Sequence, residues 1–176
     1  KKILSKNPSK KKFYGSSWTL KNYGKNKIYK DKKGIIKLQS NKILSDGIWD
    51  NVGLAIKVAR DFNISNNTIL RAVRKIKFEG RIQYIKKGKI KKLLYPKEQL
   101  LIDGCHSEAS AKNFASYLKS LNKNVYGILA IQPNKDPEQF IKQFKGVFKK
   151  IVAIKIPDEP NSCKPADLKK ILDKYN

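Results

Sequence analysis

The sequence contains no methionine, two cysteines and one histidine in 176 residues. Because Cys105 and Cys163 are too few for a disulfide framework, we expect both to be free thiols in a reducing cytoplasm. Neither belongs to a C-x-x-C pair and His106 is the single histidine, which argues against a structural zinc site. The absence of a starting methionine indicates that these residues are a piece of a longer protein.

Long apolar runs and nucleotide-binding motifs are also missing. No stretch approaches the ~20 apolar residues of a membrane span, and the start, Lys1 to Ser5, lacks the apolar region of a signal peptide. Neither G-x-x-x-x-G-K-[ST] nor G-x-G-x-x-G occurs, so a complete nucleotide site is not expected within these residues.

Arginine is scarce although the formal net charge is +26, since only four of the 40 basic residues are arginine. Proteins that bind phosphate or read bases usually favour arginine, whose planar guanidinium binds in two places at once. A solvated lysine-rich surface therefore explains the charge better than a nucleic-acid-binding module, which stays an alternative. The charge is uneven: residues 1–97 carry 27 basic and 5 acidic side chains, and residues 98–176 carry 13 and 9. This change near residue 97 suggests two regions.

In the first half, hydrophobic periodicity predicts hairpin strands followed by two helices. The expected strands are Phe13–Tyr14, Lys27–Tyr29 and Ile35–Leu38, separated by glycine turns, after a lysine-rich loop over residues 1–12. Helices are expected over 46–62, capped by Asp46 or Asp50, and from Ser65. The inward residues of the first helix are predicted to be Val52, Ala55, Ile56, Ala59 and Phe62. Residues 81–94 alternate in polarity around a turn at 86–89, which predicts a further hairpin.

The second half alternates strands and helices, which is typical of an α/β fold with a mostly parallel sheet. The expected strands are 100–102, 125–131 and 151–156, and the expected helices are 107–121, 137–148 and 165–175. Ligands in such sheets bind where the strands end. The candidate loops are therefore those that begin at Asp103, Gln132 and Pro157.

Three places could carry chemistry. Asp103 and His106 share one strand-to-helix loop, where they could act on a ligand or serve only as a loop cap and a surface histidine. Lys135 could neutralise a phosphate or carboxylate, beside Asp136 as the cap of the next helix. Arg81 lies where the two regions meet, a common place for a ligand. Cys105 beside His106 does not indicate a thiol protease, because catalytic pairs are rarely sequence neighbours.

Five segments, in order, resemble the dihydrofolate synthase/folylpolyglutamate synthase family. Phe78–Gln83 is similar to its W-P-G-R-L-Q segment, and Leu100–Ser107 is similar to its L-L-L-D-G-A-H-N segment. Asn134–Asp136 matches a late K-D element, Ile156–Asn161 resembles a loop with proline and asparagine, and Asp50–Ile56 resembles the N-A-x-x-A-I helix. The resemblance implies the Mur-ligase fold: the end of a central ATP-binding domain over 1–78 and a Rossmann-like carboxy-terminal domain over 79–176, which stops before the family's last strand.

The resemblance also implies an activity. Family members use ATP and Mg²⁺ to join L-glutamate to dihydropteroate or to a folylpolyglutamate chain through an acyl phosphate. It implies ATP contacts for Asn51, Arg81 and Asp103, a place for His106 near the reacting centre, and a possible substrate contact for Lys135. The phosphate loop and metal ligands are expected upstream of these residues, so no metal site is predicted here. We therefore expect the chain to be inactive alone.

The resemblance leaves some properties open. A Mur-type ligase of cell-wall precursors is the close alternative, and the choice between dihydrofolate synthase, folylpolyglutamate synthase or both is open. We expect a cytoplasmic monomer with a role in folate biosynthesis, bound to neither membrane nor specific nucleic acid.

Overall fold

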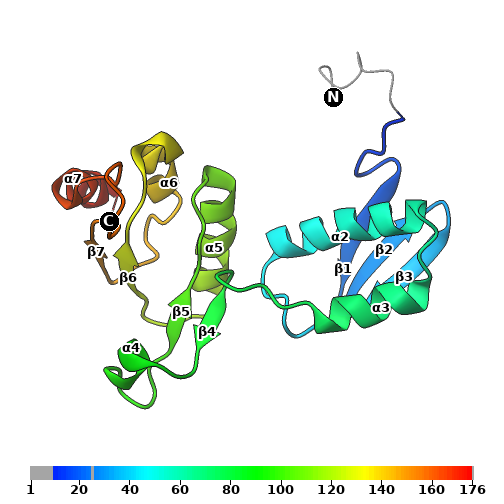
Figure 1. Cartoon of the computed structure of the whole chain (residues 1–176), viewed down its shortest axis with the longest axis horizontal. Helices are drawn as coiled ribbons and strands as arrows, with labels where there is room; N and C mark the ends of the chain where they lie inside the picture. The colour runs from blue at the N-terminus through cyan, green and yellow to red at the C-terminus, as the bar shows by residue number, and fades with distance from the viewer. Residues whose placement is uncertain (1–9, 25, 176) are drawn as a thin grey trace. The chain divides into compact units, whose positions relative to one another are not determined.

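The computed structural model describes residues 10–24 and 26–175, and Figure 1 shows the order of its elements. The chain divides into two compact units, one ending at Lys77 and the other beginning at Phe78. Most of the lysine-rich start, expected to be a loop, lies outside the described residues, and residues 10–12 form no helix or strand. The assignment of the units to an ATP-binding domain and a ligase domain stays a prediction.

The first unit is an antiparallel sheet packed against two helices. Its strands β1 (Trp18–Tyr23), β2 (Asn26–Asp31) and β3 (Gly34–Leu38) are hydrogen-bonded in the order β1-β2-β3. The expected strands β2 and β3 are confirmed. The expected strand at Phe13–Tyr14 is wrong: Tyr14 makes only an isolated bridge to Trp18. Gly15 at φ 88° reverses the chain there, so β1 begins later.

Helices α2 (Asp46–Asp61) and α3 (Asn66–Lys75) follow the sheet. Both begin at a serine N-cap. Ser45 rather than Asp46 or Asp50 caps α2 by accepting a hydrogen bond from the backbone N–H of Ile48 at 3.3 Å. A hydroxyl one residue earlier satisfies a free helix N–H equally well.

The buried face of α2 differs in part from the prediction. Val52 and Ile56 are buried and Ala59 is partly buried, as expected, whereas Ala55 is exposed and Phe62 is 77% exposed. Four further residues of the helix are also buried: Trp49, Gly53, Lys57 and Arg60. The sequence did not predict this group because two of its members are charged.

The second unit is an α/β arrangement with one parallel strand pair, which confirms the expected class. Its strands are β4 (Gln83–Ile85), β5 (Leu100–Ile102), β6 (Tyr126–Leu129) and β7 (Lys150–Ala153). Strands β6 and β7 pair in parallel, and β4 and β5 pair antiparallel. Its helices are α4 (Lys89–Lys92), α5 (Glu108–Ser120), the 3₁₀ turn η1 (Pro133–Lys135), α6 (Pro137–Lys142) and α7 (Pro165–Tyr175).

Helices α5, α6 and α7 enclose the core of this unit with one face of β6 and β7. The most buried members are Ala111, Phe140, Ile141 and Leu168, and Leu129 and Ile151 of the strands pack against them. Strands β6 and β7 and helix α6 are shorter than predicted. Along α5, the apolar residues Ala111, Ala115 and Leu118 are buried and Phe114 is partly buried.

The hairpin predicted over 81–94 is wrong. Residues 89–92 form the short helix α4 after Gly88 at φ 122°, and β4 pairs with β5 instead. Ile90 and Leu93 are 64% and 84% exposed, so neither contributes to the core of this unit. Leu101 of β5 does pack against the core, which makes β5 the better partner.

Candidate functional site

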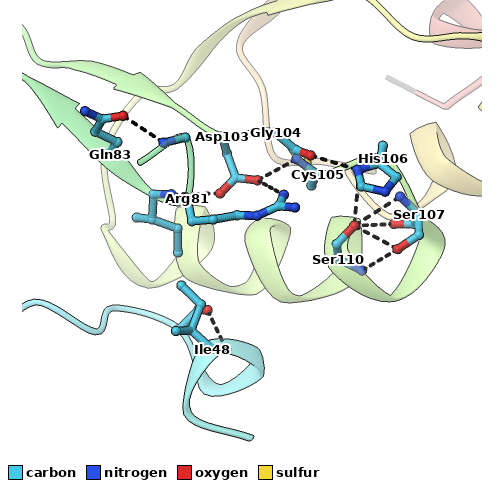
Figure 2. Close-up of polar contacts among 12 residues, drawn as sticks. Ile48, Arg81, Gln83, Asp103, Gly104, Cys105, His106, Ser107 and Ser110 are labelled. Carbon is cyan, nitrogen blue, oxygen red and sulfur yellow. Dashed lines mark hydrogen bonds and ion pairs between the residues drawn. The ribbon is translucent and has the colours of Figure 1, made fainter. Parts of the chain in front are cut away.

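The antiparallel β4–β5 pair brings together two of the loops predicted to carry chemistry. Gln83 at the start of β4 lies opposite Ile102 at the end of β5. The residues just before β4 therefore adjoin those just after β5, as Figure 2 shows. The backbone N–H of Gly104 donates to the carbonyl of Gly80 at 2.7 Å and ties the two loops together.

The Asp103 carboxylate connects the same two loops. Its Oδ2 accepts the backbone N–H of Ile82 at 2.7 Å, and its Oδ1 accepts the backbone N–H of Cys105 at 2.8 Å. Nη1 of Arg81 lies 3.9 Å from Oδ1, and the Asp103 side chain is only 5% exposed. Both oxygens therefore have partners within the protein.

Arg81 stands between two residues in the left-handed region. Gly80 has φ 64° and Ile82 has φ 46°. Glycine adopts this conformation freely, but a β-branched residue there is strained by about 1–3 kcal/mol. Gln83 supports the turn, since its Oε1 accepts the N–H of Gly80 at 2.7 Å.

The Arg81 guanidinium is available to an anion. Its side chain is 40% exposed, and 3.9 Å from Nη1 to Asp103 is a weak ion pair rather than a hydrogen bond. Gly104 lies beside it, since an added Cβ at that position would lie 3.6 Å from Nη1. An exposed guanidinium suits the recognition of a phosphate.

His106 is exposed, and its ring orientation follows from one hydrogen bond. Nδ1 lies 3.0 Å from the carbonyl oxygen of Gly104. A carbonyl only accepts, so Nδ1 carries the proton, and in the neutral ring Nε2 is left as an acceptor. The histidine can therefore take a proton or a hydrogen bond from a ligand at Nε2.

Ser107 confirms the expected start of α5. Its hydroxyl accepts from the N–H of Ser110 at 3.4 Å, and the Ser110 hydroxyl accepts from the N–H of Ser107 at 3.0 Å and from His106 at 3.2 Å. This capping box holds the His106 backbone at the helix entrance. The sequence did not predict Ser110 as part of the site, although the S-x-x-S spacing is visible in it. Nor did the sequence predict Ile82 and Gln83 as parts of the site.

The pKa values of both thiols of this unit are raised. Burial, together with the nearby Asp103 carboxylate, raises the pKa of Cys105 to about 12. Burial also raises the pKa of Cys163. Because the thiolate is the reactive form, Cys105 stays protonated and inert beside His106.

The other predicted site residues lie elsewhere. Lys135 is exposed at the end of η1, and Asp136 caps α6 as expected by accepting from Gln139 at 3.3 Å. A hydrogen bond of 3.0 Å from Gln132 to Glu159 joins the loops after β6 and β7. Asn51 is exposed on α2 of the first unit.

The described residues contain neither a metal-binding cluster nor a membrane-spanning helix. Within ranges 10–24 and 26–175, no group of three or more His, Cys, Asp or Glu side chains could bind a metal ion. Nor is any helix in those ranges long and apolar enough to span a membrane.

Comparison with known proteins gives structural matches only. Neither a family model nor a curated protein matches the sequence. E. coli FolC in complex with ADP superposes with a TM-score of 0.79 at 16% identity, over 98% of this chain and 40% of that one. A Mycobacterium tuberculosis folylpolyglutamate synthase complexed with ADP and AMPPCP gives 0.72 at 15% identity, over 92% and 37%.

A third structure agrees with these two. A bifunctional folylpolyglutamate synthase/dihydrofolate synthase with Mn, AMPPNP and L-glutamate bound gives a TM-score of 0.72 at 12% identity, over 90% and 36% of the two chains. The fold is that of folylpolyglutamate synthase. The present chain spans about two fifths of the folylpolyglutamate synthase chains that it matches. The fold expected from the sequence motifs is therefore confirmed.

Proposed function

We propose that this chain is the carboxy-terminal part of an ATP-dependent ligase that adds L-glutamate to dihydropteroate, to folylpolyglutamate, or to both. The observation that carries the proposal is the half-exposed Arg81 guanidinium, held beside the His106 loop by the β4–β5 pair. The fold supports it, as do the ADP and L-glutamate bound by proteins of the same fold.

The proposal gives each loop a role. Arg81 binds the phosphates of ATP, where a fixed cation offsets charge that develops during phosphoryl transfer. His106 presents Nε2 toward the glutamate side of the reaction, to accept a proton or hydrogen bond from the incoming amine. Asn51 is proposed as a further ATP contact from the first unit, and Lys135 as a contact for a phosphate or carboxylate.

The residues present fit a nucleotide but supply only part of its site. ATP, with Mg²⁺, activates the carboxylate of the acceptor as an acyl phosphate. The exposed Arg81 guanidinium suits the phosphate end of the nucleotide. No phosphate-loop motif occurs in the sequence, so turnover needs an ATP-binding segment outside residues 1–176. We propose a cytoplasmic monomer for this function.

The test is ADP binding to the chain by calorimetry, with Arg81→Ala and Arg74→Ala compared. Arg74 lies exposed on α3, so its removal matches the charge change. We expect Arg81→Ala to weaken ADP binding about 10-fold or more, as for loss of a charged hydrogen bond, and Arg74→Ala to change it little. Equal losses in both variants would mean that ADP is held by general basic charge.

Ligation assays then separate the close alternatives, in a protein that carries this chain together with its ATP-binding part. Ligation of L-glutamate to dihydropteroate or a folate supports the proposal. Ligation to a cell-wall nucleotide precursor would assign a Mur-type ligase instead. Tight DNA binding retained at physiological salt would favour a nucleic-acid-binding module, since non-specific phosphate contacts weaken steeply with salt.

A further inference from the structure

Both oxygens of the Asp103 carboxylate are hydrogen-bonded within the protein. Two backbone N–H groups, from Ile82 and Cys105, donate to its two oxygens at 2.7 and 2.8 Å. Its side chain is 5% exposed, against 40% for Arg81. A group this enclosed offers little surface to a ligand. The carboxylate also carries the same sign of charge as a phosphate.

One of those donors is the strained residue of the site. Ile82 has φ 46° and is 5% exposed, so its side chain is fixed in the protein interior while its backbone is left-handed. Such a conformation persists only where surrounding contacts hold it. The Asp103 hydrogen bond to the Ile82 N–H is the charge-assisted contact available for this purpose.

The strained turn determines where Arg81 points. The preceding residue, Gly80, is also left-handed and is held by Gln83 and by the N–H of Gly104. Arg81 therefore lies on a turn of three residues whose two flanks are both hydrogen-bonded. Loss of the Asp103 contact would let Ile82 relax, and the guanidinium would lose its place beside Gly104.

We propose that Asp103 is a positioning residue, which holds the Gly80–Ile82 turn so that Arg81 faces the nucleotide, rather than a ligand of the nucleotide itself. The part that concerns nucleotide rests on the proposed function. The proposal differs from the ATP contact that the sequence resemblance implies for Asp103. In this proposal Arg81 contacts the nucleotide directly, and the Asp103 carboxylate affects nucleotide binding only through the position of Arg81.

The first measurement needs no nucleotide. Amide hydrogen exchange is followed by NMR in the whole chain, in the wild type, Asp103→Ala and Asp103→Asn. We expect Ile82 and Cys105 amides to exchange at least about 10-fold faster in Asp103→Ala, because each loses a hydrogen bond to a charged acceptor. Asp103→Asn keeps one acceptor oxygen, so its effect should be intermediate.

The matched control is Asp173→Asn, which removes the same charge from an exposed ion pair on α7. It should leave the Ile82 and Cys105 amides unchanged. Amides of α7 serve as the folding check for the Asp103 variants. The Asn variant covers the case in which the Ala variant does not fold. Unchanged exchange at Ile82 in the folded Asp103 variants would overturn the proposal.

The second measurement is a double-mutant cycle on ADP affinity with Asp103→Asn and Arg81→Ala. If Asp103 acts through Arg81, Asp103→Asn weakens ADP binding in the wild type but has no further effect beside Arg81→Ala. An undiminished loss in the Arg81→Ala background would mean a direct contact and would overturn the proposal. If the wild type binds no ADP, the proposed function fails for this chain, and the exchange measurement still decides whether Asp103 holds the turn.

Discussion

The buried charge cluster of the first unit makes the sharpest stability prediction. Asp31 ends β2 with a side chain that is 0% exposed. Its carboxylate accepts the N–H of Lys33 at 2.8 Å and the hydroxyl of Tyr29 at 3.1 Å. It also lies 3.5 Å from Nε of Arg60 and 3.8 Å from Nζ of Lys57. One carboxylate therefore compensates two buried cations.

Asp31→Asn removes the charge and keeps the size of the side chain. Lys57 and Arg60 have side chains that are each 4% exposed, so solvent cannot replace the lost partner. Breaking a buried pair by removing one partner costs about 3–5 kcal/mol. Lys57 keeps its ion pair with Asp61, so we expect the lower end, about 3 kcal/mol.

Tryptophan fluorescence reports this loss specifically. The two tryptophans of the sequence, Trp18 and Trp49, are both buried in the core of the first unit. Urea unfolding is followed by their emission. The unfolding midpoint of Asp31→Asn should lie at a lower urea concentration, while the slope of unfolding free energy against urea concentration stays unchanged. Asp173→Asn, on an exposed pair of α7, should leave this transition in place. A loss below about 1 kcal/mol in Asp31→Asn would refute the claim that the carboxylate compensates buried charge.

Two further predictions concern packing and thiol reactivity. Gly53→Ala should destabilise the first unit by about 1–3 kcal/mol, because the added Cβ would lie 2.7 Å from Cζ3 of Trp18 and 3.3 Å from Cδ2 of Leu20; an unchanged urea midpoint would contradict that contact. In a Cys163→Ser variant, alkylation of Cys105 by iodoacetamide should rise about tenfold per pH unit from pH 8 to 10, since only the thiolate reacts and its pKa is raised to about 12. A plateau below pH 10 would show that the thiol ionises near its ordinary value.

The elements that the sequence predicted well are those with local signals. Helix α7 was expected over 165–175 and has those bounds, because its apolar spacing and first-turn proline lie within one segment. The hairpin of β2 and β3 was found from the turn at Gly34, which has φ 108°. Such signals depend only on residues close together in the chain, so a single sequence is enough to identify them.

The pairing of β4 was not predictable in this way. The alternation of apolar and polar residues indicates a strand. Which strand it pairs with depends on which other segment of the chain packs its apolar side chains into the same core. Ile90 and Leu93 looked as suitable as the residues of β5 until their exposure was known. The role of Asp103 was hidden for the same reason, since its partner Ile82 lies 21 residues earlier in the chain.

The missed pairing is also what assembles the candidate site. A hairpin turning at 86–89 would have placed Arg81 opposite Leu94, and β4 would then not have been paired with the strand that leads into the loop of Asp103 and His106. Pairing with β5 instead sets Gln83 opposite Ile102, so the turn before one strand meets the loop after the other. The motif residues alone therefore do not make the site. Substitutions that weaken the β4–β5 register should separate Arg81 from the His106 loop even though they touch neither residue.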